Sequence, residues 1–132
     1  MIAEAGVNHN GDTDTAVELV DVAAGAGADA VKFQTFRADA LVTKDAQKAA
    51  YQKETSGADE SQHQMLSKLE LSVDQHRTLL ERCEERHIEF MSTPFDRQSA
   101  DLLEDLGVAI FKIGSGDLTN LPLLRQIGRA HV

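Results

Sequence analysis

Four short apolar stretches recur along this chain, and each of them ends in a cluster of polar residues. The stretches begin near positions 2, 30, 90 and 110, and a helical pattern follows each one, after a long insertion in the second case. Strands that alternate with helices at this spacing are typical of an α/β fold with a parallel sheet. In such a fold the strand ends that lead into helices point to one face, so the polar clusters are expected to meet there.

The helices are predicted from apolar residues that recur every three to four positions and from the residues that cap them. The first helix is expected at 14–26, and Gly27 is placed to end it. The fourth strand is expected at 109–113, after Gly107 ends the third helix. The predicted capping residues at the four helix starts are Asp12 or Thr13, Ser72 with Gln75, Asp96, and Asn120.

The segment 36–71 is long for a connection between a strand and a helix, which usually takes about two to six residues. An insertion at the strand-end side of such a fold is typical of a lid or binding loop, and Tyr51 and Gln52 are candidates to cover a site. Within it, Ser61 and Gln64 have the spacing of a capping box. The short helix that they predict would turn three apolar residues inward: Met65, Leu66 and Leu69.

Charge and cysteine content limit the classes of function. The 132 residues carry 22 acidic and 13 basic side chains, a net charge of -9, which argues against a nucleic-acid partner. A small anion is still a possible ligand, because a few lysines focused in a cleft outweigh a diffuse negative surface. Cys83 is the only cysteine and no apolar run is long enough to span a bilayer, so we expect a cytoplasmic protein without a membrane partner.

Four strand–helix units make half of an eight-unit barrel, which needs about 250 residues. A half barrel would leave the strands at 2–5 and 109–113 with unpaired edges, which favours aggregation. We therefore expect residues 1–132 to be the first part of a larger (β/α)8 barrel domain. The last six residues, 127–132, resemble a translated sequencing adapter, and we place no functional residue among them.

Two lysines, Lys32 and Lys112, lie at predicted strand ends within otherwise apolar segments. A buried ammonium group needs a negatively charged partner, because desolvation without one costs several kcal/mol or lowers its pKa. That partner is either an anionic substrate or a nearby carboxylate of the protein. For Lys32 the carboxylate alternative is Glu4, which lies in the first strand.

Four motifs in the same order resemble the sialic acid synthase family, and they cover most of the chain. They are IAEAGVNHNGD at 2–12, KFQTF at 32–36, STPFD at 92–96 and FKIGSGDLTNLP at 111–122. The resemblance implies a (β/α)8 barrel that condenses phosphoenolpyruvate with an N-acetylated amino sugar to a nonulosonic (sialic-acid-like) 2-keto acid and phosphate. It implies a divalent metal, Mn²⁺ or Mg²⁺, whose histidine ligands come from later strands outside this chain. It also implies a C-terminal antifreeze-like domain, absent here, that completes the site of the partner in a homodimer.

Site residues follow from the resemblance together with their positions at strand ends. Lys32, Lys112, Thr93 and Ser115 are expected to hold phosphoenolpyruvate, and the glycines beside Ser115 let backbone approach a phosphate. Glu4 is expected to face the metal and to serve proton and water chemistry, so the catalytic candidates are Glu4 and Lys112. Sugar hydroxyl groups are assigned to Gln34 and Asp117, although some synthases have Glu where this chain has Asp117.

Two alternatives remain open. One is a barrel aldolase that forms a Schiff base on Lys112; the other is an inactive fragment with weak anion binding. The remaining histidines are not assigned to the site: His9 is a weak candidate for a metal ligand, and the sequence predicts that His63, His76 and His87 face solvent.

Overall fold

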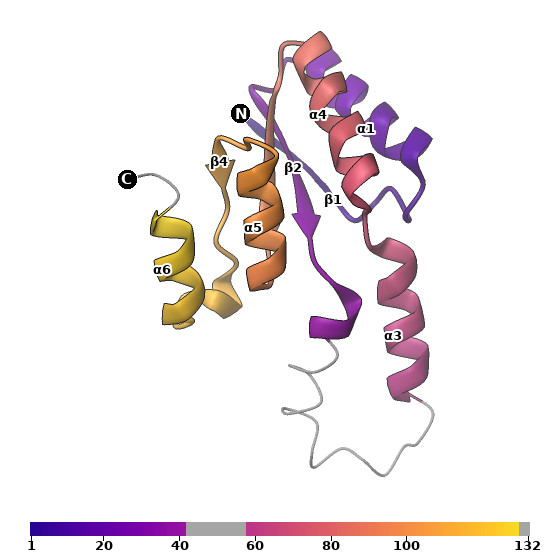
Figure 1. Cartoon of the computed structure of the whole chain (residues 1–132). Helices are drawn as coiled ribbons and strands as arrows, with labels where there is room; N and C mark the ends of the chain where they lie inside the picture. Colours follow the sequence, from indigo (N-terminus) through magenta and orange to yellow (C-terminus); the bar gives the residue numbers. More distant parts are fainter. Residues whose placement is uncertain (42–57, 130–132) are drawn as a thin grey trace.

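The computed structural model describes residues 1–41 and 58–129, and it contains one parallel sheet with the strands in sequential order, β1-β2-β3-β4 (Figure 1). Each strand is joined to the next by a segment that contains at least one helix, as predicted for the N-terminal half of a (β/α)8 barrel. The fold class expected from the sequence is confirmed. The strands are β1 (Ile2–Gly6), β2 (Ala30–Thr35), β3 (Glu89–Pro94) and β4 (Ile110–Phe111).

Helices cover one face of this sheet (Figure 1). The main core joins apolar side chains of three helices to those of the strands, and Leu79, Leu103 and Val20 are fully buried in it. No helix among the described residues is both long and apolar enough to cross a bilayer. The helices are α1 (Thr13–Gly25), α3 (Ala58–Leu69), α4 (Val73–Glu85), α5 (Arg97–Asp105) and α6 (Leu121–Arg129), with a 3-10 turn, η1 (Ser115–Asp117).

Strand register separates the side chains of the sheet into two faces, because alternate residues of a strand point in opposite directions. In β2, Phe33 packs against the helices and stacks on Phe90 of β3 with ring centroids 5.6 Å apart. The neighbouring Lys32 points the other way and pairs in register with Glu4. We call the first side the helix face and the second the open face.

The predicted caps account for the starts of α1, α4 and α5. Asp12 accepts a hydrogen bond from Thr15 N at the start of α1, and Asp96 accepts one from Ser99 N at the start of α5. Both halves of the capping box predicted before α4 are present, since Ser72 and Gln75 each receive the other's backbone N–H. These predictions are confirmed, because local capping chemistry is sufficient to set a helix start.

Two predictions about element boundaries are wrong. The helix α3 begins at Ala58, so Ser61 and Gln64 lie within it rather than at a cap, and Met65 is 56% exposed. Helix α3 contributes none of its described side chains to the main core, and for this reason its apolar residues need not lie on one buried face. Strand β4 is also shorter than predicted, although Lys112 N still donates to Ser92 O at 2.9 Å. Tyr51 and Gln52 lie outside the described residues.

Candidate functional site

A hollow of about 320 Å³ lies on the open face, toward the carboxyl ends of the strands. Five of the residues that the sequence assigned to a site contribute to its wall, and they come from or directly follow all four strands. The predicted convergence of separated polar clusters on one side of the sheet is therefore seen for these five. The lining residues are Glu4, Gly6, Val7, Asn8, Lys32, Gln34, Thr93, Phe95 and Lys112.

Lys32 and Glu4 form an ion pair within this hollow, with Nζ and Oε2 2.6 Å apart. The lysine side chain is only 19% exposed, whereas the glutamate side chain is 53% exposed. The carboxylate partner considered for Lys32 from the sequence is thus present. Because Glu4 remains half exposed, the pair still presents charge of both signs to any molecule that enters the hollow.

Gly6 gives the Glu4 carboxylate its position, and sequence reasoning had not assigned it to the site. Its φ of +54° is one that side-chain-bearing residues rarely adopt. A Cβ at this position would lie 3.1 Å from Glu4 Oε1. The glycine therefore leaves room for the carboxylate, and the register shift between β1 and β2 occurs at the same place.

The other side of the hollow is formed by the ends of β2, β3 and β4. Gln34 and Thr93 are register partners on neighbouring strands, and Thr93 is nearly buried. Lys112 follows directly after β4 and is half-buried. An amide, a hydroxyl and two ammonium groups thus border one small space, and all four can donate hydrogen bonds to anionic oxygens.

Ser115 and Asp117 are not among the described residues that line this hollow. Ser115 is exposed in η1, and the Asp117 carboxylate is buried and accepts from Asn120 Nδ2 at 3.1 Å. The loop that carries them is nevertheless close, because a Cβ on Gly114 would lie 3.6 Å from Thr93 Cγ2. Their assignment to phosphoenolpyruvate and to sugar hydroxyl groups stays a prediction.

The described residues do not form a metal site of their own. No group of three or more His, Cys, Asp or Glu side chains within 1–41 and 58–129 is arranged to hold a metal ion. Among the described residues that line the hollow there is one carboxylate, Glu4, and that group is bound to Lys32. This donor set does not fit a divalent cation, and we assign no step to one here.

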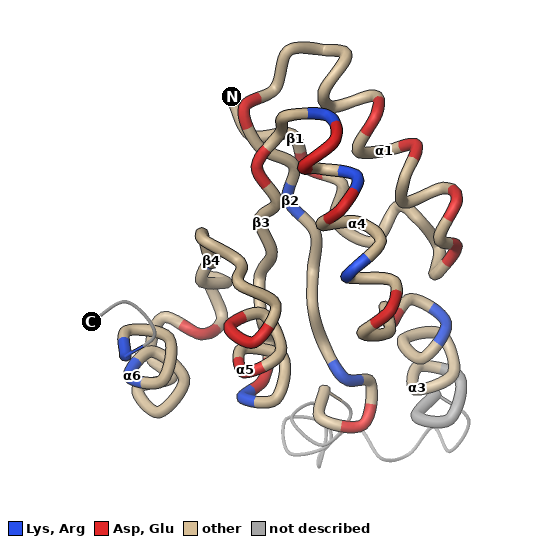
Figure 2. Tube along the Cα trace, turned by 45° about the horizontal axis from the view of Figure 1, so that its top comes forward, with Lys and Arg blue, Asp and Glu red and all other residues tan. Residues whose placement is uncertain are grey.

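Charge is distributed differently over the rest of the molecule. Figure 2 shows acidic residues spread along the helices, including α1, α4 and α5. One of them, Asp21 of α1, binds Arg82 of α4 through two hydrogen bonds of 2.7 and 2.9 Å, and this lowers the pKa of the carboxyl group. The negative surface thus lies mostly on helices, whereas the lysines of the site come from the sheet.

His76 is fully buried on the helix face, so the prediction that it faces solvent is wrong. Its Nδ1 lies 2.8 Å from Ser72 O and its Nε2 lies 2.9 Å from Thr35 Oγ1. Burial lowers its pKa, although the bond to the Ser72 carbonyl opposes this. The sequence did contain a signal, because His76 precedes Leu79 and Cys83 on the same buried stripe of α4.

His9 is also fully buried, in the turn after β1. Its Nδ1 accepts a hydrogen bond from Gly11 N at 2.8 Å, while its Nε2 is buried without a hydrogen-bond partner among the described residues. Burial and the nearby His76 lower the pKa of His9. By contrast His87 is exposed, as predicted, and His63 is partly exposed beside Asp39.

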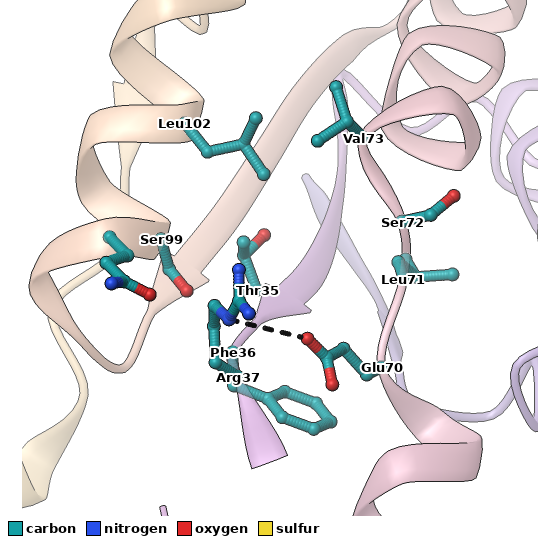
Figure 3. A pocket seen from close by; sticks show the side chains of 10 residues that line it. Thr35, Phe36, Arg37, Glu70, Leu71, Ser72, Val73, Ser99 and Leu102 are labelled. Carbon is teal, nitrogen blue, oxygen red and sulfur yellow. Dashed lines mark ion pairs between the residues drawn. The ribbon is translucent and has the colours of Figure 1, made fainter. Parts of the chain in front are cut away.

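A second hollow, of about 250 Å³, lies between the starts of α4 and α5 and the end of β2 (Figure 3). Arg37 and Glu70 face each other across it with Nε and Oε1 3.9 Å apart. Thr35 also lines it, but its hydroxyl is already bound to His76 and Ser92. The lysines predicted for the site line the first hollow and not this one.

Comparison with known proteins gives consistent matches over this chain. The model described as the NeuB family matches residues 19–131. The N,N'-diacetyllegionaminic acid synthase of Campylobacter jejuni is 52% identical over 129 residues, which are 98% of this chain and 39% of that protein. The synthase of the same name from Legionella pneumophila is 55% identical over 126 residues, 96% of this chain and 35% of that protein.

A solved structure agrees with the fold. The N-acetylneuraminic acid (sialic acid) synthetase of Leptospira borgpetersenii, crystallised in complex with citrate, superimposes with a TM-score of 0.80 at 32% sequence identity. The match covers 98% of this chain and 40% of that one. The chain therefore spans well under half the length of these relatives.

Proposed function

The chain belongs to the NeuB family, and we propose that the hollow on its open face is the phosphoenolpyruvate site of a nonulosonic acid synthase. Its relatives are legionaminic and sialic acid synthases, so it belongs to a family of enzymes. The proposed reaction joins phosphoenolpyruvate to an N-acetylated amino sugar and yields a nine-carbon 2-keto acid and phosphate. Because the chain spans only 39% of the Campylobacter relative, this activity is proposed for the complete protein.

The observation that supports this proposal is the convergence of Lys32 and Lys112 on one small hollow. Phosphoenolpyruvate carries a carboxylate and a phosphate, which are two separate centres of negative charge. Two ammonium groups on different strands can bind one centre each, while Thr93 donates a hydrogen bond between them. Gln34, which was assigned from the sequence to sugar hydroxyl groups, is the register partner of Thr93, and we propose here that it also donates to the anion. A hollow of this composition inside an acidic protein focuses its positive charge where a small anion enters.

In the proposed reaction the C3 carbon of phosphoenolpyruvate attacks the aldehyde carbon of the sugar. Water adds at C2, and phosphate leaves from the resulting tetrahedral carbon. Glu4 can accept a proton from that water and return a proton to the former aldehyde oxygen, which becomes a hydroxyl group, while its bond to Lys32 orients the carboxylate. Fixing the reacting atoms in this way is the main contribution that these side chains can make.

The predictions about the metal, the amino sugar and the homodimer concern the complete protein and are proposals. A divalent cation, Mn²⁺ or Mg²⁺, would need ligands from outside residues 1–132. The identity of the amino sugar and the formation of a homodimer with an antifreeze-like domain depend on the part of the relatives' length that this chain does not match. A cytoplasmic location stays a prediction.

In the lysine aldolase alternative, Lys112 would have to form a covalent imine with a substrate carbonyl. Borohydride reduction in the presence of the keto acid product distinguishes the two mechanisms. We expect no mass increase on Lys112. A reduced adduct at this residue would exclude the phosphoenolpyruvate mechanism.

The proposed function is tested most simply in a chimera that carries residues 1–126 of this chain in place of the matching segment of the Legionella relative. We expect the chimera to release phosphate from phosphoenolpyruvate only when an N-acetylated amino sugar is present. The isolated chain is expected to give no turnover. A folded chimera that releases no phosphate would contradict the proposal, and turnover by the isolated chain would contradict the expectation that residues 1–132 alone are inactive.

A further inference from the structure

Three buried polar side chains lie in a row on the helix face, directly behind the hollow. Ser92 Oγ lies 2.7 Å from Thr35 Oγ1, and Thr35 Oγ1 lies 2.9 Å from His76 Nε2. The row ends where His76 Nδ1 meets the Ser72 carbonyl at 2.8 Å. Each of the three side chains is 3% exposed or less, so the two bonds that join them are shielded from water.

The direction of the hydrogen bonds follows from the end of the row. A carbonyl oxygen only accepts, so His76 Nδ1 carries the proton and donates to Ser72 O. In a neutral imidazole Nε2 is then an acceptor, so the Thr35 hydroxyl donates to it and the Ser92 hydroxyl donates to Thr35. Burial lowers the pKa of His76 and thereby favours this neutral form.

The row lies behind the residues that line the proposed anion site. Thr35 follows Gln34 in β2 and Ser92 precedes Thr93 in β3, and neighbouring residues of a strand point to opposite faces. Gln34 and Thr93 are themselves register partners. A bond between Thr35 and Ser92 on one face therefore fixes the spacing of Gln34 and Thr93 on the other.

The first turn of α4 contacts more than one of the loops around the site. Gln75, next to His76, donates from Nε2 to Gly11 O at 3.1 Å and to Thr13 Oγ1 at 2.9 Å. Gly11 belongs to the connection between β1 and α1, and Thr13 is the first residue of α1. One helical turn thus binds the segment after β1 and the end of β2 directly, and it is linked to Ser92 of β3 through Thr35.

We infer that His76 is a positioning residue for the proposed site, which holds the carboxyl ends of β2 and β3 so that Gln34 and Thr93 meet the bound anion. The catalytic part of this inference rests on the proposed function. The structural part, that His76 controls the positions of Gln34 and Thr93 through Thr35, does not.

Two substitutions of His76 test the hydrogen bonds of its two ring nitrogens separately. In His76→Asn the side-chain amide can still donate to Ser72 O but does not reach Thr35, whereas His76→Gln can present an acceptor to the Thr35 hydroxyl. Thr35→Val removes this bond, together with the bond to Ser92, at nearly constant volume. We would measure kcat and KM for phosphoenolpyruvate in the Legionella chimera, well below the unfolding temperature of each variant.

We expect His76→Asn and Thr35→Val to raise the KM for phosphoenolpyruvate by about tenfold, with a smaller effect on kcat. His76→Gln should stay within about twofold of the parent, which a merely structural role for the imidazole ring would not predict. Should His76→Asn fail to fold, Thr35→Val alone decides. An unchanged KM in Thr35→Val, or a loss in His76→Gln as large as that in His76→Asn, would overturn the inference.

A second measurement keeps the inference separate from the proposed function. In the isotope-labelled chain, the side-chain amide signal of Gln34 and the backbone amide signal of Thr93 should shift in His76→Asn and Thr35→Val but not in His76→Gln. If the parent chimera is inactive while these shifts occur, the proposed function fails and the positioning role stands. If the signals do not move, the positioning role fails whatever the activity.

Discussion

The two faces of the β2–β3 pair use the same strands for different purposes. On the open face, Lys32 is charged and bound to a half-exposed carboxylate. On the helix face, Phe33 stacks on Phe90, and the polar groups among them are neutral and hydrogen-bonded, as His76 is. Charge is tolerated where solvent or a ligand can reach it, whereas the buried side chains of His76, Thr35 and Ser92 on the covered side are paired with one another. We therefore expect substitutions on the helix face to affect mainly stability and substitutions on the open face to affect mainly ligand binding.

The largest effect on stability is expected from the helix face. Phe33→Ala removes a fully buried ring from the centre of the core and should lower the free energy of unfolding by about 3–5 kcal/mol. Gln34→Ala changes the next residue, which is half-buried on the open face, and should cost less than about 1 kcal/mol. Urea denaturation of both variants measures the difference. Similar losses would mean that the two faces contribute equally.

Gly11 and Gly27 have nearly the same positive φ, but within the described part of the chain only Gly11 is covered by another segment. Gly11 has a φ of +78° and an added Cβ would lie 1.8 Å from Lys68 O, whereas Gly27 has a φ of +80° and open space around it. We expect Gly27→Ala to cost about 1 kcal/mol from backbone strain alone. Gly11→Ala should cost about 3 kcal/mol or more, since the backbone of α3 must also move. Equal unfolding midpoints for the two variants would show that α3 does not pack on this turn.

On the open face, the expected effect is on binding. Lys112→Ala removes one of the two ammonium groups and should weaken phosphoenolpyruvate binding about 100-fold, or about 2.7 kcal/mol, with little change in stability. The matched control is Lys68→Ala, which removes an exposed lysine from α3, away from the hollow. Isothermal titration of the chimera compares the two. Unchanged affinity in Lys112→Ala would refute its assigned role.

The smallest expected effect is a dependence of stability on pH. Burial lowers the pKa of His76 and of His9 below the ordinary histidine value of 6.5. Well above pH 6.5 both side chains are neutral in the folded and in the unfolded state, so protonation of these histidines does not reduce the free energy of unfolding. As the pH falls below 6.5 the unfolded chain binds protons that the folded chain does not, and stability is lost. The slope should reach at most about 1.4 kcal/mol per pH unit for each histidine.

Urea midpoints between pH 7.5 and 5 measure this slope, and the exposed His87 provides the control. His87→Asn should leave the slope unchanged. A flat profile across this range would mean that the buried imidazoles become protonated in the folded state as readily as in the unfolded one.

Most of the fold was predictable because its signals are local. Asp12, Ser72 and Asp96 cap helices through bonds to residues three positions away, and such bonds need no tertiary structure. The failure at Ser61 has the opposite cause. Its capping-box spacing competes with helix-forming neighbours on both sides, and α3 continues through it.

The site was only partly predictable from the sequence. The strand-end positions of Lys32, Gln34 and Thr93 follow from alternation and parallel register. The roles of Gly6 and His76 depend on contacts between segments far apart in the chain, such as the 41 positions that separate Thr35 from His76. His76 shares the buried stripe of α4 with Leu79 and Cys83, but it was predicted to face solvent because the sequence does not show that Thr35 is its partner.

The central claim is that side chains from four parallel strands form one anion site on the open face. Titration of phosphoenolpyruvate into the isotope-labelled chain, followed by NMR, tests it most directly. We predict saturable shifts at Lys32, Gln34, Thr93 and Lys112, with none at Lys68. Saturable shifts confined to other parts of the chain, such as the hollow beside Arg37, or no saturable shifts at all, would contradict the claim.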